Sequence, residues 1–192
     1  MLREKLKNYH VILASGSPRR QQFFKDLDID FTIQLKEVEE LYPKELKGTE
    51  ITDFLADLKS KAFNNLSEND LLITSDTIVW LDGKALGKPK DESDAFRMLR
   101  DLSGKKHEVI TSISIKGKYF QKIINDTTIV SFNNITDEEI HYYIKNYKPL
   151  DKAGGYGIQE WIGFIAINNI EGSYFNVVGL PVHKLYKELM NL

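Results

Sequence analysis

The sequence predicts a mixed α/β fold, in which helices flank a mixed, twisted β-sheet. In the first half of the 192 residues, short apolar runs typical of strands alternate with segments whose apolar residues recur at helical spacing. In the second half, strand-like runs over 109–115 and 122–132 are joined by a short turn around Gly117, which favours local pairing. Alternating strands and locally paired strands together indicate a sheet of mixed type.

The first strand is expected over residues 11–14, and it ends at a serine–glycine–serine turn that begins with Ser15. Pro18 is favoured in the first turn of a helix, and Ser17 before it is suited to be the N-cap. A strand that leads through small residues into a helix directs several backbone N–H groups toward one point. Such an arrangement is suited to binding an anion.

Two arginines occupy the first turn of this helix. The guanidinium groups of Arg19 and Arg20 can each bind phosphate oxygens in pairs. Cations are disfavoured at a helix N-terminus unless an anion is present, which favours a phosphate site. The alternative is a surface helix that begins with two solvated arginines.

The remaining elements follow from apolar spacing and from start and stop signals. Further strands are expected over 30–35, 71–81, 109–115, 122–132, 161–170 and 174–178. Further helices are expected to begin at Thr49, Asp91, Thr136 and Pro181. Glu139 completes a capping box with Thr136, the Asp82-Gly83 pair favours a hairpin, and a glycine-rich loop is expected over 151–159.

The composition is that of an ordinary globular protein. Apolar residues make up 42% and charged residues 28% of the chain. The net charge of −2 gives no general attraction to nucleic acid or to an anionic membrane. There is no cysteine, which excludes disulfides, thiolate zinc sites and cysteine nucleophiles. No signal peptide is visible and no apolar stretch approaches the roughly 20 residues of a membrane-spanning helix, so a cytoplasmic protein is expected.

One acidic residue interrupts an apolar strand. Asp76 lies within the expected strand 71–81, where a buried carboxylate is costly unless it is paired or binds a metal ion. The alternative is an edge strand on which Asp76 faces water. A second candidate carboxylate is Glu40, at the end of the acidic segment 37–40.

These carboxylates, the two arginines and two lysines form a set with a defined chemistry. Lys61 lies near the end of the helix that begins at Thr49, and Lys88 follows the expected hairpin. Carboxylates can hold a hard divalent cation and orient water, while cations neutralise the charge on departing phosphates. The set therefore indicates metal-assisted attack of water on a phosphate chain.

Eight ordered motifs resemble those of the Maf family of nucleoside triphosphate pyrophosphatases, also called septum formation inhibitor proteins. They lie at 13–20, 39–40, 61–62, 75–79, 86–89, 102–107, 151–159 and 172–181. The Ser-Asp-Thr and Gly-Ile-Gln sequences within them are similar to those of the subgroup that acts on dTTP and UTP. The resemblance implies a fold like that of the inosine triphosphate pyrophosphatases, in a single domain over residues 1–192 with two lobes around a cleft. It also implies hydrolysis of a nucleoside triphosphate to the monophosphate and pyrophosphate.

The resemblance implies which residues carry out the reaction. Asp76 matches the proton acceptor, which activates water directly or through a divalent cation, Mg²⁺ or Mn²⁺. Glu40 is expected to hold that cation together with Asp76. Lys61 and Lys88 match further polar residues of the catalytic site.

A second set is expected to bind the substrate. Arg19, Thr77 and Gln159 match positions associated with substrate choice, and the amide of Gln159 offers both a donor and an acceptor to uracil or thymine. The complete set comprises Ser15, Ser17, Arg19, Arg20, Thr77 and Gln159.

Two alternatives remain open at this point. The first is a broader pyrophosphatase that removes modified pyrimidine nucleotides, with dTTP and UTP as incidental substrates. The second is a non-catalytic nucleotide-binding regulator of cell division. The resemblance also implies a homodimer, whose interface no sequence pattern identifies.

Overall fold

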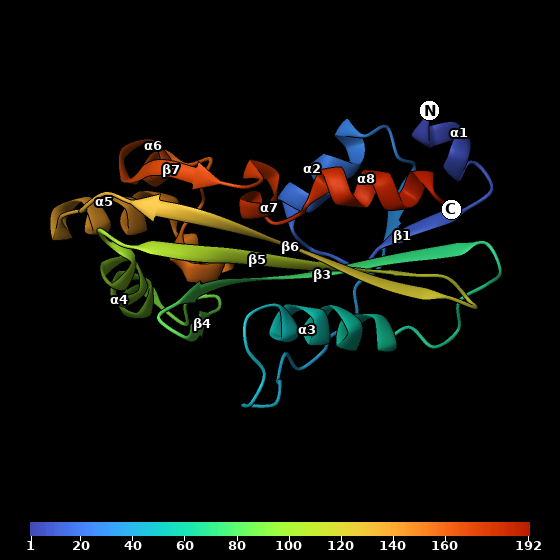
Figure 1. Ribbon diagram of the computed structural model, residues 1–192, viewed down its shortest axis with the longest axis horizontal. Coiled ribbons are helices and arrows are strands. Elements are labelled where there is room, and N and C mark those ends of the chain that lie inside the picture. The colour runs from blue at the N-terminus through green and yellow to red at the C-terminus, as the bar shows by residue number, and fades with distance from the viewer. The chain divides into compact units, whose positions relative to one another are not determined.

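The computed structural model describes residues 1–192 and confirms the predicted mixed α/β fold (Figure 1). Its strands are β1 (His10–Leu13), β2 (Phe31–Ile33), β3 (Asp70–Leu81), β4 (Lys84–Leu86), β5 (Lys106–Lys116), β6 (Gln121–Phe132) and β7 (Ile167–Glu171). They form one seven-stranded sheet in the order β2-β1-β3-β5-β6-β7, with β4 paired to β3. β1 runs parallel to β2 and β3, whereas β4 is antiparallel to β3 and β7 is antiparallel to β6. The sheet is therefore mixed, as predicted.

Eight α-helices accompany this sheet. They are α1 (Leu2–Leu6), α2 (Pro18–Asp26), α3 (Thr49–Lys61), α4 (Glu92–Leu102), α5 (Asp137–Tyr147), α6 (Trp161–Ala166), α7 (Tyr174–Val178) and α8 (Val182–Met190). Two short 3₁₀ helices, Pro149–Asp151 and Ala153–Gly155, lie in the glycine-rich region. None of the helices combines the length and the apolar character needed to cross a membrane.

The chain forms two compact units. The first comprises residues 1–76, 111–126 and 179–192, and the second comprises residues 77–110 and 127–178. β3, β5 and β6 each contribute residues to both units. Each unit has a core of its own.

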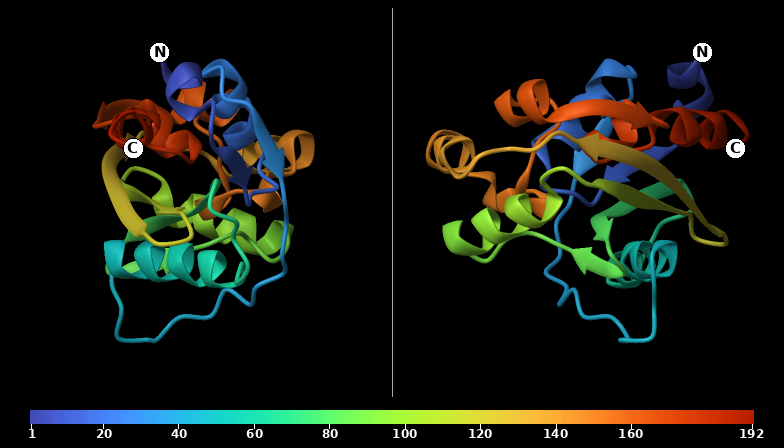
Figure 2. Two further views of the ribbon diagram at one scale, coloured as in Figure 1. Left: turned by 90° about the vertical axis from the view of Figure 1, so that its right-hand side faces the viewer. Right: turned by 60° about the vertical axis from the view of Figure 1, so that its left-hand side comes forward.

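In the first unit, the sheet presents an apolar face and a polar face. Successive residues of a strand point to opposite faces. The odd-numbered residues of β3 and β5, such as Ile73 and Ile113, belong to an apolar core with side chains of α1, α2 and α8. Their even-numbered neighbours Thr74 and Ser112 bond to α3. Figures 1 and 2 show α3 on one side of these strands and α1 beside α8 on the other.

In the second unit, α4 and α5 pack together over an apolar core that includes Val79, Leu99 and Tyr143. Both helices begin as the sequence predicts. Asp91 is the N-cap of α4, and its carboxylate accepts a hydrogen bond from the Asp94 backbone N–H. Residues 136–139 form the expected capping box at the start of α5. These local signals are therefore confirmed.

The prediction of a strand over 161–170 is wrong for its first part. Residues 161–166 form α6, and the strand β7 begins only at Ile167. A short apolar run fits a buried strand and a buried helix equally well. The buried residues Ile162 and Ala166 are four positions apart and so share one helix face, which favours the helix.

The predicted strand over 174–178 is also wrong, since these residues form α7. The Ser173 hydroxyl accepts a hydrogen bond from the Asn176 backbone N–H, in the manner of an N-cap. The fully buried Asn176 amide donates to the Val109 carbonyl at 2.9 Å and to the Thr128 hydroxyl at 3.0 Å. These side-chain bonds hold α7 in the second unit.

His107 is a buried member of the second unit. Its Nε2 lies 2.8 Å from the Tyr156 hydroxyl, and its ring meets the Phe132 ring edge-on with centroids 5.0 Å apart. Burial lowers the pKa of His107 to about 4, because the charged imidazolium is poorly solvated there. His107 is therefore a neutral structural residue at neutral pH.

This burial predicts a pH-dependent stability. Between about pH 6.5 and pH 4 the unfolded chain binds a proton at His107 that the folded chain does not, so the free energy of unfolding falls as the pH falls. From pH 7 to pH 5 the expected loss from this residue is about 2 kcal/mol. Urea unfolding at both pH values measures it, and His107→Gln should lose less stability over this interval. Equal losses in the variant and the parent would contradict the assignment.

Candidate active site

The turn between β1 and α2 has the conformation that the sequence predicts. Ser17 is the N-cap of α2 and has extended backbone angles, φ −68° and ψ 117°. Its side chain makes no capping bond. Instead, the buried Ser15 hydroxyl accepts a hydrogen bond from the Ser17 backbone N–H at 3.3 Å. The turn is therefore closed by Ser15, and the N-terminus of α2 follows directly from it.

Arg20 links this turn to two other segments. Its Nε donates to the Gly179 carbonyl at 2.8 Å, and one terminal nitrogen donates to the Ser75 carbonyl at 3.0 Å. The Ser15 hydroxyl lies 3.5 Å from the same terminal nitrogen. Burial lowers the pKa of Arg20, whereas the nearby Asp76 charge acts to raise it. Arg20 thus shapes the site through backbone carbonyls, in addition to placing a positive charge beside Asp76.

Asp76 and Glu40, the two predicted carboxylates, lie on either side of one ammonium group. The Lys59 Nζ is 2.6 Å from Asp76 Oδ1 and 2.8 Å from Glu40 Oε1. Asp76 is buried, with 7% of its surface exposed. Burial raises the pKa of the Asp76 carboxyl, and the Lys59 and Arg20 charges act in the opposite direction. The structure therefore brings together the carboxylate pair that the sequence singled out.

The lysine in this cluster is Lys59, which is not among the residues predicted from the sequence. Lys61, the predicted lysine, pairs with Asp57 at 2.6 Å and is 67% exposed at its side chain. Residues two positions apart on a helix differ by about 200° in direction, so these two lysines point to opposite sides of α3. Lys59 follows the buried Ala56 by three positions and shares its face. That spacing was the available signal for Lys59.

The other predicted residues, Thr77, Lys88 and Gln159, belong to the second unit. The Gly87 carbonyl next to Lys88 accepts a hydrogen bond from the Gly154 backbone N–H at 3.0 Å. Gly154 has a φ of +68°, and a Cβ there would lie 2.7 Å from the Val79 side chain, so only glycine fits. The glycine-rich loop is thereby fixed against the segment that carries Lys88.

Gln159 has a side-chain oxygen that is buried and has no hydrogen-bond partner within the protein. Its neighbour Glu160 is fully engaged, because it accepts a hydrogen bond from the Tyr143 hydroxyl and pairs with the Lys152 Nζ at 3.1 Å. An unsatisfied buried acceptor costs about 1–3 kcal/mol. The Gln159 oxygen is therefore suited to accept a hydrogen bond from a ligand.

Metal binding can be judged from the donor set. The structure contains no group of three or more histidine, aspartate or glutamate side chains arranged to hold a metal ion. Mg²⁺ commonly binds to one or two carboxylates and completes its shell with water and substrate phosphates. Asp76 and Glu40 supply such a pair, so the residues present fit an ion that arrives with a phosphate substrate.

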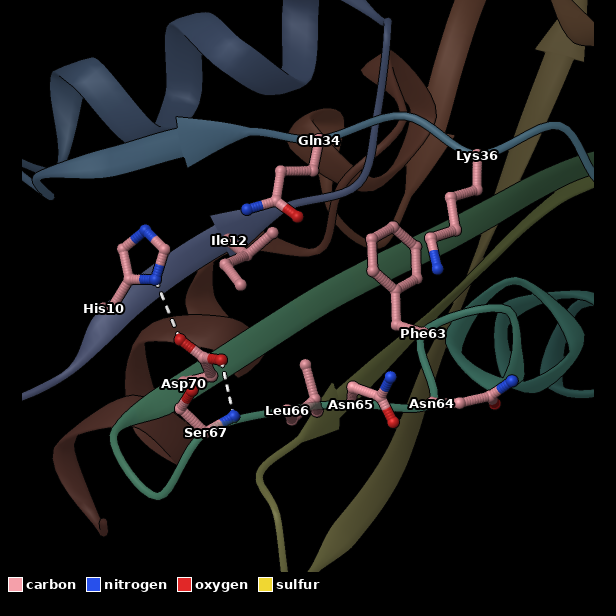
Figure 3. A pocket seen from close by; sticks show the side chains of 10 residues that line it. All are labelled: His10, Ile12, Gln34, Lys36, Phe63, Asn64, Asn65, Leu66, Ser67 and Asp70. Atoms are coloured by element: carbon pink, nitrogen blue, oxygen red, sulfur yellow. Dashed lines mark hydrogen bonds and ion pairs between the residues drawn. The ribbon is translucent and has the colours of Figure 1, made fainter.

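A cavity of about 440 Å³ lies on the first unit, at the His10 end of β1 (Figure 3). Its one carboxylate, Asp70, is bonded to His10 Nδ1 at 2.8 Å and to the Ser67 backbone N–H at 2.7 Å. Asp70 therefore has no second carboxylate beside it and is already engaged. The Asp76 cluster is the stronger candidate for hydrolytic chemistry.

Known proteins with similar sequences include nucleotide-hydrolysing enzymes. The model of the Maf-like protein family matches residues 10–192. The chain is 61% identical to the dTTP/UTP pyrophosphatase of Flavobacterium johnsoniae, over 100% of both chains. It is 62% identical to the dTTP/UTP pyrophosphatase of Flavobacterium psychrophilum, over 100% of this chain and 98% of that one.

Among solved structures, a HAM1 protein from Coxiella burnetii has a similar fold. The TM-score is 0.52 at 15% identity, and the match covers 96% of this chain and 100% of that chain. At this identity the likeness concerns the fold alone. The family match and the close full-length relatives carry the assignment, and the chain belongs to the Maf-like protein family.

Proposed function

We propose that this protein hydrolyses dTTP and UTP to the nucleoside monophosphate and pyrophosphate. The observation that carries the proposal is the buried Asp76 joined through Lys59 to Glu40, in a chain whose full-length relatives are named dTTP/UTP pyrophosphatases. A buried carboxylate beside cations is an arrangement suited to activating water against a phosphate. We further propose that the enzyme acts in the cytoplasm, where nucleoside triphosphates are made and used.

In the proposed reaction, Asp76 accepts a proton from the attacking water. A general base works best when its pKa approaches the working pH, and the raised pKa of Asp76 moves it in that direction. The water oxygen bonds to the α-phosphorus, and the bond from that phosphorus to the bridging oxygen breaks. Pyrophosphate leaves with the bonding electrons.

Positive groups stabilise the charge that develops on the leaving group. Lys59 and Arg20 lie beside Asp76 in the structure, and Arg19 occupies the adjacent first turn of α2. We assign the α2 N-terminus and Arg19 to the phosphate chain, because backbone N–H groups and guanidinium groups both bind phosphate oxygens. Lys88 of the second unit is proposed to add to this charge.

Mg²⁺ or Mn²⁺ would be held by Asp76 and Glu40. When bound, the ion supplies Lewis-acid stabilisation of the phosphate oxygens and lowers the pKa of a bound water. Lys59 already neutralises part of the charge of both carboxylates, so it also limits their mutual repulsion in the absence of the ion.

The first test measures pyrophosphate release from a panel of ribonucleoside and deoxyribonucleoside triphosphates with Mg²⁺ or Mn²⁺. We expect dTTP and UTP to lead, and Asp76→Asn to lower kcat by about 10²–10⁴-fold, the usual contribution of a general base. The panel includes 5-methyl-UTP and pseudo-UTP. Asp57→Asn, which removes an α3 carboxylate outside the cluster, is the matched control. Full activity in Asp76→Asn would refute the assignment.

The second test compares the two lysines of α3. Lys59→Met should lower kcat/KM about 100-fold, because it removes a positive charge beside the buried Asp76. Lys61→Met should change kcat/KM less than about twofold, because the side chain of Lys61 is largely exposed and pairs with Asp57, outside the Asp76 cluster. Steady-state kinetics of both variants show which of the two lysines contributes to catalysis. The reverse order of effects would favour the lysine chosen from the sequence.

The third test concerns base recognition by Gln159. Its unpartnered oxygen can accept a hydrogen bond from N3–H of uracil or thymine, a hydrogen that cytosine lacks. Gln159→Glu keeps an acceptor for N3–H but replaces the amide donor, which can pair with a carbonyl oxygen of uracil or thymine, with a second acceptor that suits the amino group of cytosine. It should therefore lower the ratio of kcat/KM for dTTP to that for dCTP by about tenfold. An unchanged ratio would contradict a role of Gln159 in base recognition, whatever the overall rate.

A further inference from the structure

α3 is attached to the sheet of the first unit through hydrogen bonds. The Thr52 hydroxyl lies 2.6 Å from the Ser112 hydroxyl, which in turn donates to Asp53 at 2.6 Å. One turn before the end of the helix, Gln121 donates to Asp57 at 2.7 Å and to the Ser60 hydroxyl at 3.0 Å. Such directional bonds fix the position of the helix along the strands more closely than apolar packing does.

The bond nearest to the catalytic cluster joins Thr74 of β3 to Ala56 of α3. The Thr74 hydroxyl donates to the Ala56 carbonyl at 2.6 Å, and both residues are fully buried. Thr74 and Asp76 are two positions apart on a strand and so share one face of the sheet. Ala56 and Lys59 are three positions apart on a helix and share one face of it. The face of β3 that carries Thr74 and Asp76 therefore lies against the face of α3 that carries Ala56 and Lys59. Thr74 contacts Ala56, and Asp76 contacts Lys59.

We propose that Thr74 is a positioning residue, whose hydroxyl sets the distance between α3 and β3 and so places Lys59 against Asp76. The expected effect of Thr74 on kcat rests on the proposed function, whereas its expected effect on the position of Lys59 does not. A hydroxyl approaches a carbonyl oxygen to 2.6 Å, whereas a carbon atom stops at about 3.3 Å. Replacing the hydroxyl with a methyl group therefore moves the Ala56 carbonyl away by about 0.7 Å, and Lys59 moves with the helix.

The test is Thr74→Val, which keeps the shape of the side chain and removes the hydroxyl. We expect kcat for dTTP to fall about tenfold with KM changed less than about twofold, since small displacements of a catalytic group affect the transition state most. Thr74→Ser, which keeps the hydroxyl, should restore kcat. In a Lys59→Met background, Thr74→Val should lower kcat by less than about twofold, because the group it positions is absent.

Thr52→Val is the matched control. It is the same substitution at a fully buried threonine of the same interface, about two helical turns from Lys59. There the hydroxyl meets the Ser112 side chain, which can rotate away from an added methyl group, whereas the Ala56 carbonyl cannot move without the helix. It should lower the melting temperature as much as Thr74→Val does and leave kcat within about twofold of the parent. Equal kcat losses in the two variants would overturn the proposal in favour of a general loss of stability.

A crystal structure of Thr74→Val provides a readout independent of activity. The distance from the Lys59 Nζ to Asp76 Oδ1 should lengthen from 2.6 Å to about 3.3 Å, and it should return to its original value in Thr74→Ser. If the variant does not fold, Thr74→Ala removes the same bond to the Ala56 carbonyl without adding a methyl contact, and a loss of kcat that Thr74→Ser does not show would still support the proposal. An unmoved Lys59 overturns the proposal. If the parent protein hydrolyses no nucleoside triphosphate, the proposed function fails, and the position of Lys59 in the variant still decides the role of Thr74.

Discussion

The candidate site depends on one ammonium group that lies between two carboxylates. Without Lys59, Asp76 and Glu40 would lose the ammonium group that lies between them, and burying Asp76 would be far more costly. The pair of contacts also fixes the segment that carries Glu40, which has no helix or strand of its own, relative to β3. Lys59 therefore organises the site as well as neutralising it.

The two faces of the sheet in the first unit have different roles, one in stability and the other in the positioning of α3. One face packs apolar side chains of β1, β3 and β5 against α1, α2 and α8, which supplies the burial that stabilises the unit. The other face, under α3, uses hydroxyl and amide groups, which contribute less to stability and more to position. Alternation along the strands makes this possible, because neighbouring residues such as Ile73 and Thr74 serve different faces.

The sequence predicts much of this arrangement, and the predictions that are wrong have physical causes. The strand–turn–helix motif, the Asp76 carboxylate in a buried strand and the capping box of α5 are local patterns, and the structure confirms them. The sequence predicts strands at α6 and α7 because mainly apolar segments of only five or six residues do not reveal whether their period is that of a helix or of a strand. The motif resemblance points to Lys61, and the three-residue spacing of Lys59 from Ala56 becomes informative only once the packing of α3 shows that Ala56 is buried. The roles of Thr77, Lys88 and Gln159 stay predictions.

The link from Arg20 to the Gly179 carbonyl has a consequence for how the protein is made. The two residues are 159 positions apart in the chain. A ribosome releases the chain from its N-terminal end, so the turn after β1 emerges long before its anchor does. The nascent chain can fold its local helices early, but the guanidinium of Arg20 reaches the Gly179 carbonyl only after residue 179 has left the ribosome. The turn should therefore reach its final conformation only at that later stage of synthesis.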